Sequence, residues 1–261
     1  WGVNTGGSTG GGGFITSGAN LTLNDWHHIA FTFDRDGNGV IYINGVANRT
    51  AAANPNDYSS VDITSTADVF IGRGDGYFDG EISNAAIFNT VLDASAISTI
   101  YNSGQPETAI SSSPVSWYKL NNTASGIQDS GSASNDGTNN GATEIQTNVW
   151  TPRLNGESTT LPTSALTPSD LQFESPYSNY SLDFDGTNDY IDCTDNDMFS
   201  FGNGSTDNPF SVSFWYNPTT IPASFGIIAK DNDASNREWT IGQFSSTNKI
   251  RFLLKNNGGS N

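Results

Sequence analysis

Residues 25–34 have the sequence DWHHIAFTFD, and its pattern indicates the fold class. Side chains alternate along it, placing Ile29, Phe31 and Phe33 on one face of a strand. A Gly-Asn-Gly turn at residues 37–39 leads into the apolar run VIYI, and Asn-Gly at residues 44–45 then suits the two positive-φ positions of a type I′ hairpin. The sequence therefore predicts a three-stranded antiparallel meander with one apolar face.

Short runs of the same kind continue along the chain, separated by Gly, Asn and Asp. They predict further strands at 68–72, 78–89, 115–120, 180–185, 189–193, 210–216, 226–230, 239–242 and 249–254. One short helix is predicted, because Asp93 suits an N-cap, Ile97 and Ile100 share an apolar stripe, and Gly104 suits a left-handed C-cap. The fold class is all-β with one short helix.

Composition and charge exclude several classes of function. Of the 261 residues, 34% are hydrophobic. This content is enough for a buried core, and no membrane insertion is expected. Asp and Glu number 27 against 10 Lys and Arg, giving a net charge of −17, so the surface repels a phosphate backbone and no nucleic-acid partner is expected. Cys193 is the single cysteine, cannot form an internal disulfide, and is expected to be buried. This composition is compatible with an extracellular protein.

Two groups of motifs resemble a known family. SLDFDGTNDYI at residues 181–191 and FSVSFWYNP at 210–218 resemble the amino-terminal half of laminin G-like (pentraxin-like) domains in the concanavalin A-like lectin/glucanase superfamily. NDWHHIA at residues 24–30, IYING at 41–45 and YFDGEI at 77–82 resemble its carboxy-terminal half. The resemblance implies a concanavalin A-like antiparallel β-sandwich, or jelly roll.

The two halves occur in reversed order, which leaves two domain organisations open. In the first, residues 1–104 are the C-terminal part of one sandwich, 105–114 a linker, and 115–261 the N-terminal part of a second. In the second, both parts form one circularly permuted sandwich. The N-terminal WGV and FIT segments resemble a weaker copy of the segments at 239–254, and this overlap favours an array of tandem repeats.

No catalytic residues are predicted. The superfamily includes glycoside hydrolases, which place two carboxylates about a glycosidic bond. The compact Glu-x-Asp-x-Glu strand pattern of the laminarinase-like branch is absent, and the glutamates are scattered. A glycoside hydrolase is therefore the third hypothesis. His27 and His28, the only histidines, are expected to serve packing and hydrogen bonding.

Calcium is the predicted cofactor. Asp185, Asn188 and Asp189 offer oxygen ligands within one turn. The resemblance implies a calcium site where this turn approaches the final long strand, represented here by Asp79 and Glu81. The same residues also fit the opposing interpretation, in which each Asp closes an Asx turn with its own backbone.

Loop aromatics are the predicted ligand-binding residues, because a sugar ring packs on an aromatic face. Tyr58, Tyr77, Tyr177 and Tyr180 lie near loops and are expected to be exposed. The expected partners are glycans or cell-surface polysaccharide, together with neighbouring copies or other structural subunits.

The irregular stretch at residues 154–171 resembles segments that precede such domains in proteins of marine bacteriophages. The leading hypothesis is a non-enzymatic carbohydrate- or cell-surface-binding and display module of a repetitive extracellular adhesin or virion appendage. The alternative is a purely structural spacer or decoration domain. The predicted location is extracellular, at a cell surface or a virion surface.

Overall fold

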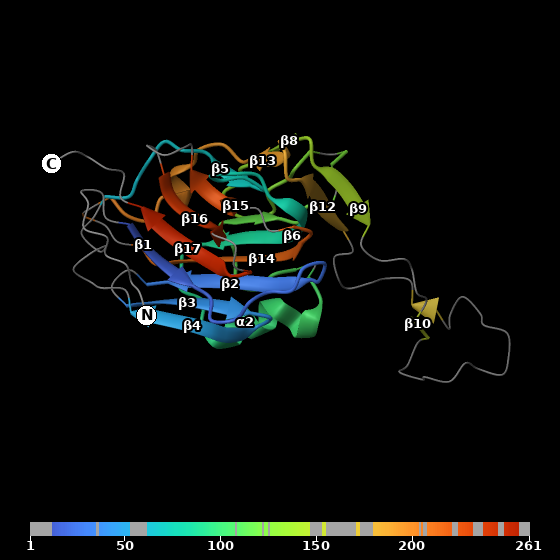
Figure 1. Cartoon of the computed structure of the whole chain (residues 1–261), viewed down its shortest axis with the longest axis horizontal. Helices are drawn as coiled ribbons and strands as arrows, with labels where there is room; N and C mark the ends of the chain where they lie inside the picture. Colours follow the sequence, from blue (N-terminus) through green and yellow to red (C-terminus); the bar gives the residue numbers. More distant parts are fainter. Residues whose placement is uncertain are drawn as a thin grey trace.

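The chain folds into two packed antiparallel β-sheets with a short helix on the outside (Figure 1). This computed structural model describes residues 12–34, 37–52, 62–107, 109–121, 123–124, 126–146, 153–154, 171–172, 180–203, 205, 208–220, 224–231, 237–244 and 248–255. The predicted all-β antiparallel sandwich is confirmed.

The larger sheet has eight strands. In spatial order these are β4 (Val46–Ala52), β3 (Asn38–Ile43), β2 (His27–Phe33), β14 (Phe210–Pro218), β6 (Asp79–Phe88), β12 (Tyr180–Asp185) and β9 (Thr143–Gln146), with β7 (Ser116–Tyr118) also paired to β6. The hairpin between β3 and β4 turns at Asn44 and Gly45, whose φ angles are 50° and 75°. The Asn-Gly signal therefore predicted this turn correctly.

The second sheet has seven strands. Their order is β1 (Gly12–Thr16), β17 (Ile250–Lys255), β16 (Arg237–Phe244), β15 (Ser224–Asp231), β5 (Val69–Ile71), β13 (Tyr190–Asp192) and β8 (Thr138–Asn140). Two short strands, β10 (Arg153–Leu154) and β11 (Leu171–Gln172), pair only with each other. The segment η3 (Asp197–Phe199) is a single 3-10 turn that follows β13.

Each sheet combines strands from both sides of residues 105–114. In the larger sheet β14 lies between β2 and β6, and in the smaller one β5 lies between β15 and β13. The strand β17 also pairs with β1 along five residue pairs. Segments far apart in the sequence therefore complete one another's hydrogen-bonding ladders.

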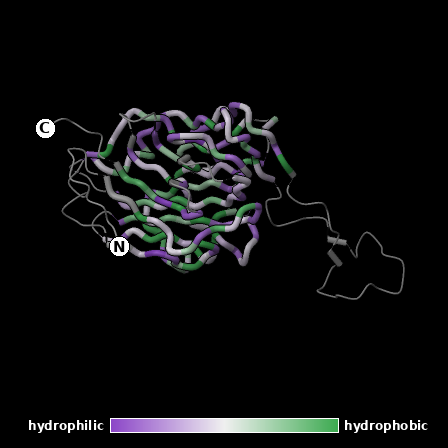
Figure 2. The backbone as a smooth tube through the Cα atoms, viewed as in Figure 1, coloured by the Kyte–Doolittle hydropathy of each residue, from purple (hydrophilic) through white to green (hydrophobic). Residues whose placement is uncertain are grey.

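The core lies between the sheets and is rich in aromatic rings, and the hydropathy of the backbone segments shows the apolar strands passing through it (Figure 2). Phe31 of β2 stacks on Phe252 of β17 with ring centroids 3.7 Å apart, which joins the two sheets. Phe201 stacks on Phe210 at 4.1 Å. Because truncating such a ring to alanine costs about 3–5 kcal/mol, these contacts are a main source of stability.

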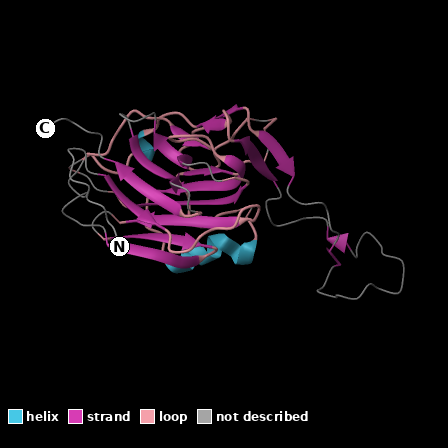
Figure 3. Cartoon of the chain, in the orientation of Figure 1, coloured by secondary structure: helices cyan, strands magenta, loops and turns pink. Residues whose placement is uncertain are grey.

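The helix α2 (Ala94–Tyr101) covers part of the outer face of the larger sheet (Figure 3). Asp93 caps its start, accepting a hydrogen bond from the Ala96 N–H at 2.8 Å, as predicted. The prediction of Gly104 as the left-handed C-cap was wrong, because Asn102 takes that conformation first, at φ 45°, and donates its N–H to the last turn. Within the described segments no helix is long and apolar enough to cross a membrane.

A second apolar cluster lies beneath this helix. It is made of Ala30, Tyr42, Ala86, Phe88, Leu92, Ile97, Ile100 and Trp117. Ile97 and Ile100 come from the helix and Leu92 from the connection before it, whereas the other members lie on the sheet face that points away from the main core. The helix therefore covers this part of the face.

The turn after β5 approaches β15 unusually closely. A Cβ atom added to Gly74 would lie 2.7 Å from the Gly226 Cα, and one added to Gly226 would lie 2.6 Å from the Gly74 Cα. Both obstructing atoms belong to the backbone. Two facing glycines therefore allow the turn to rest directly on the strand.

Candidate functional site

The strand pairing of β12 with β6 gathers carboxylates on the outer face of the larger sheet. Asp185 lies opposite Asp79, and Asp183 lies opposite Glu81. Since side chains alternate along a strand and Phe184 is fully buried in the core, Asp183 and Asp185 point outward. These four residues and Asp189 are called the acidic patch below.

In the described part of the chain, every carboxylate of the acidic patch except that of Asp183 accepts a hydrogen bond from a nearby donor. Asp185 Oδ1 accepts from the backbone N–H groups of Thr187 (2.8 Å) and Asn188 (3.2 Å), the Asx turn that its sequence favours. Asp189 Oδ2 accepts from the Asp185 N–H at 3.1 Å. The remaining two carboxylates accept from hydroxyl groups: Ser181 donates to Glu81 at 2.6 Å and Thr220 donates to Asp79 at 2.7 Å.

The charges of the acidic patch repel one another. Partial burial raises the pKa of Asp183, and the negative charges of Glu81, Asp79, Asp189 and Asp185 raise it further. Burial also raises the pKa of Asp189, whereas the backbone donors of Thr187 and Asn188 lower that of Asp185. The patch is thus a concentration of negative potential that a bound cation would offset.

The residue types of the acidic patch match those that bind calcium, but their oxygen atoms do not converge on one point in this structure. The structure brings Asp79, Glu81, Asp185 and Asp189 together, as the resemblance implied, and carboxylate oxygens are the ligands that Ca²⁺ prefers. Yet in the described part of the chain no three His, Cys, Asp or Glu residues converge as a metal-holding group. The oxygens instead face hydroxyl and amide donors.

A pocket of about 400 Å³ opens where the loops after β7 meet the start of β12. Most of its lining is polar and comes from a stretch rich in Asn, Ser and Gly. The lining residues are Lys119, Leu120, Asn121, Gly126, Ile127, Gln128, Ser130, Glu144 and Tyr180. Tyr180 was predicted as a ligand-binding residue, and it is half-buried at this wall.

Internal hydrogen bonds hold the walls of this pocket. Glu144 accepts from the backbone N–H of Thr123 at 2.8 Å, and Lys119 Nζ lies 4.4 Å from the ring centre of Trp117. The Asp129 carboxylate accepts four hydrogen bonds, from the Ser116 hydroxyl (2.7 Å) and from the backbone N–H groups of residues 117, 131 and 135 (2.8, 2.8 and 2.9 Å). A single half-buried carboxylate thus fixes the loop that shapes the pocket.

The sequence did not identify most of this pocket. Asp129, Gln128 and Glu144 lie in a polar stretch without periodicity, where every residue type is typical of a solvated loop. The one available signal is the motif Asp129-Ser130-Gly131, which is typical of a turn that an Asp side chain closes.

The other predicted tyrosines do not gather at the pocket. Tyr77 packs in an aromatic group around Arg73, whose guanidinium carbon lies 4.6 Å from the Phe70 ring centre, 5.0 Å from that of Tyr190 and 6.0 Å from that of Tyr77. Tyr58 and Tyr177 lie outside the described residues.

The two histidines have the predicted packing and hydrogen-bonding roles. His28 Nε2 lies 2.8 Å from the Ser213 hydroxyl, and complete burial lowers the pKa of His28 to about 3, so the ring is neutral. His27 Nε2 lies 3.0 Å from the Thr22 carbonyl oxygen. Cys193 is fully buried, as predicted, and burial raises the pKa of its thiol.

Comparison with known proteins gives one match. A laminin G family model, described as the concanavalin A-like lectin/glucanases superfamily, matches residues 1–98. No curated protein and no solved structure matches the chain. Proteins of this superfamily are often carbohydrate-binding or structural, and its lectin-like laminin G members are generally non-enzymatic. The two-sheet antiparallel sandwich and this match together give the chain a concanavalin A-like fold.

Proposed function

We propose that the chain is a non-enzymatic carbohydrate-binding and display module of an extracellular adhesin or virion appendage. The observation that carries this proposal is the polar pocket beside Tyr180. It lies among loops at the edge of a rigid sandwich, which is where such scaffolds commonly present binding residues.

The lining of the pocket has the chemistry that a glycan requires. Sugar hydroxyls both donate and accept hydrogen bonds, and the amides of Asn121 and Gln128 do the same. Lys119 supplies donors and Glu144 an acceptor, while Tyr180 and the apolar side chains of the lining offer surface for a sugar ring. Cell-surface polysaccharides carry these groups in repeated units.

Calcium at the acidic patch is the proposed cofactor. The ligands would be side-chain oxygens of the turn and of β6, after small rotations of the carboxylates away from their present donors. They are those of Asp79, Glu81, Asp185, Asn188 and Asp189. A cation there would neutralise the repulsion that raises the pKa of Asp183. Its expected role is to stabilise the edge formed by β12, whose first residue, Tyr180, lines the pocket.

The arrangement of the carboxylates favours binding over hydrolysis. A glycoside hydrolase places its two carboxyl groups on opposite sides of the scissile bond. Glu144 is the single carboxylate among the residues that line the pocket, and Asp183 and Glu81, cross-strand neighbours in the acidic patch, are not among them. The alternative proposal is a structural spacer or decoration domain that contacts neighbouring copies and binds no glycan.

The test is a glycan-array assay on the full chain, in calcium and then in a chelator. We expect specific binding that Tyr180→Ala weakens about tenfold, since it removes the aromatic wall. Tyr77→Ala, in the group around Arg73, is the matched control and is expected to bind as well as the unmodified chain. Loss of binding in chelator would support the calcium role. Absence of binding by a well-folded chain would support the spacer role instead.

We also propose that both parts of the chain act as one sandwich. Support comes from the shared ladders of β14 with β2 and β6. Thermal unfolding followed by calorimetry should then show one cooperative transition with equal calorimetric and van't Hoff enthalpies. Two resolved transitions would favour two independent parts on either side of residues 105–114.

A further inference from the structure

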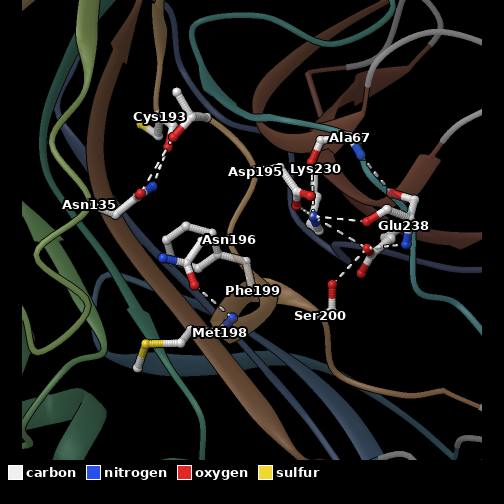
Figure 4. A network of polar contacts seen from close by, with 12 residues as sticks. Ala67, Asn135, Cys193, Asp195, Asn196, Met198, Phe199, Ser200, Lys230 and Glu238 are labelled. Atoms are coloured by element: carbon white, nitrogen blue, oxygen red, sulfur yellow. Dashed lines mark hydrogen bonds and ion pairs between the residues drawn. The ribbon is translucent and has the colours of Figure 1, made fainter.

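A lysine and two carboxylates meet inside the smaller sheet, away from the pocket and the acidic patch (Figure 4). Lys230 lies near the end of β15 and is fully buried. Its Nζ atom is 2.5 Å from Asp195 Oδ1 and 3.4 Å from Glu238 Oε1. Glu238 belongs to β16, whereas Asp195 lies in the connection between β13 and η3. These three residues are called the Lys230 cluster.

Hydrogen bonds hold the Lys230 cluster in a fixed geometry. Lys230 Nζ also donates to the carbonyl oxygen of Ala67 at 2.8 Å. Glu238 Oε1 accepts from the Ser65 N–H at 2.6 Å and from the Ser200 hydroxyl at 2.9 Å. The nitrogen and both acids therefore start close together, with little freedom to separate.

Within the Lys230 cluster, Glu238 is the residue placed to carry a proton. The Glu238 side chain is completely buried, and no hydrogen-bond partner of its Oε2 atom lies among the residues that the structure describes. Burial raises the pKa of Glu238 to about 7, because a charged carboxylate is poorly solvated there. This carboxyl can thus hold or release a proton near neutral pH. The Asp195 side chain is 32% exposed, which gives a departing water molecule a route to solvent.

We propose that Lys230 and Asp195 become joined by an intramolecular amide bond, formed by the chain itself with Glu238 as the proton carrier. The product ties the end of β15 to the segment that follows β13. Such a link would act as a covalent staple in a chain whose single cysteine cannot form an internal disulfide.

The reaction balances without an oxidant or a cofactor. A proton first passes from the Lys230 ammonium to the Asp195 carboxylate, leaving a neutral amine and a neutral acid. The Nζ lone pair attacks Asp195 Cγ, forming the C–N bond while the C=O electron pair moves to oxygen. Glu238 takes a second proton from Nζ and delivers it to the departing hydroxyl. The C–O bond breaks, one water leaves, and Glu238 returns to its starting state.

The test is the intact mass of the full chain, purified in its native state and then denatured for mass spectrometry. We expect a mass lower than that of the sequence by one water molecule. Protease digestion should yield a branched peptide that joins the Lys230 and Asp195 segments, with no tryptic cleavage after Lys230. The full sequence mass in a chain that circular dichroism shows to be folded would overturn the proposal.

Variants locate the bond and test the role of Glu238. Lys230→Arg keeps the positive charge but cannot form this amide, so the full mass should return, as it should in Asp195→Ala. Asp195→Asn should give the same linked product by releasing ammonia. Glu238→Gln, which keeps the shape but cannot carry the proton, should leave most of the chain unlinked. Lys249→Arg is the matched control and should keep the loss of water. A loss of water that persists in Lys230→Arg would place it elsewhere and overturn the proposal.

Discussion

Neighbouring carboxylates are stabilised in opposite ways in the acidic patch and in the Lys230 cluster. In the acidic patch, Asp183 and its neighbours keep their charges at an outer face of the sheet, where water and local donors stabilise them. In the Lys230 cluster, Lys230 and Glu238 are fully buried, and one ammonium lies between two acids until the proposed amide forms. The first arrangement tolerates substitution and responds to dissolved ions, whereas the second depends on each member.

This contrast separates two roles for charge in one sandwich. Exposed charges act mainly on partners in solution, since salt and water screen them. Buried charges act on one another, and removing one leaves the others without compensation.

Replacing Lys230 should have the largest effect. Lys230→Met keeps a similar shape but removes both the cation beside the buried Glu238 and the proposed link to Asp195, so we expect a loss of about 3–5 kcal/mol in the free energy of unfolding. Urea denaturation followed by tryptophan fluorescence measures it. Lys249→Met, at a half-buried position before β17, is the control and should change stability by about 0.5 kcal/mol or less. If both substitutions lowered the free energy of unfolding equally, the proposed difference between buried and exposed charges would be wrong.

The Lys230 cluster should also make stability depend on pH. The pKa of Glu238 rises from 4.5 to about 7 on folding, so between these values the native state holds a proton that the unfolded chain has released. The contribution of Glu238 is therefore complete below about pH 4.5 and is lost as the pH rises to about 7, a fall of about 3 kcal/mol.

Glu238→Gln removes this titration. Its free energy of unfolding, measured by urea denaturation across the same pH range, should lack the fall that the unmodified chain shows. An unchanged slope in Glu238→Gln would assign the pH dependence to other groups.

Removing a charge from the acidic patch should raise the free energy of unfolding, whereas removing Lys230 should lower it. Asp183→Asn removes one member of a repelling group, so we expect a gain of up to about 1 kcal/mol, limited by solvent screening. Asp197→Asn, an exposed acid in the short 3-10 turn, is the control. A loss of stability in Asp183→Asn would indicate that its carboxylate is held by favourable contacts instead.

Salt should produce the smallest effect and act mainly on the acidic patch. Sodium chloride screens exposed like charges, so raising it should stabilise the unmodified chain by roughly 0.3 kcal/mol. This stabilisation by salt should be smaller in Asp183→Asn, which has one exposed charge fewer, and unchanged in Lys230→Met. Thermal denaturation at several salt concentrations measures both comparisons.

Local signals predicted most of the fold. The alternation in β2 placed Ile29, Phe31 and Phe33 on the buried face, and Asp93 marked the start of the helix. The end of the helix was misplaced because Asn102 and Gly104 both adopt positive φ, and sequence alone favours glycine. Such errors arise where two nearby residues satisfy one conformational requirement.

The candidate sites were harder to predict, because they depend on strand order. The resemblance implied that the turn after β12 approaches a strand like β6, but it left open whether that strand belongs to the same sandwich; in the structure Asp185 lies opposite Asp79. The Lys230 cluster was missed, since Asp195 is 35 residues away from Lys230 in sequence. One signal was present: Lys230 ends the run Ile227-Ile228-Ala229, on the same strand face as Ile228, where a charge requires a buried partner.

The facing glycines at 74 and 226 have a consequence for sequence change over time. A side chain at either position would collide with the backbone opposite, and no rotation of a neighbouring side chain can relieve that collision. Neither glycine can therefore be replaced first while the turn keeps its path, so the two positions form a single coupled constraint. Relatives that retain this turn should retain both glycines, and relatives that have lost one should show a rebuilt or displaced turn over β15.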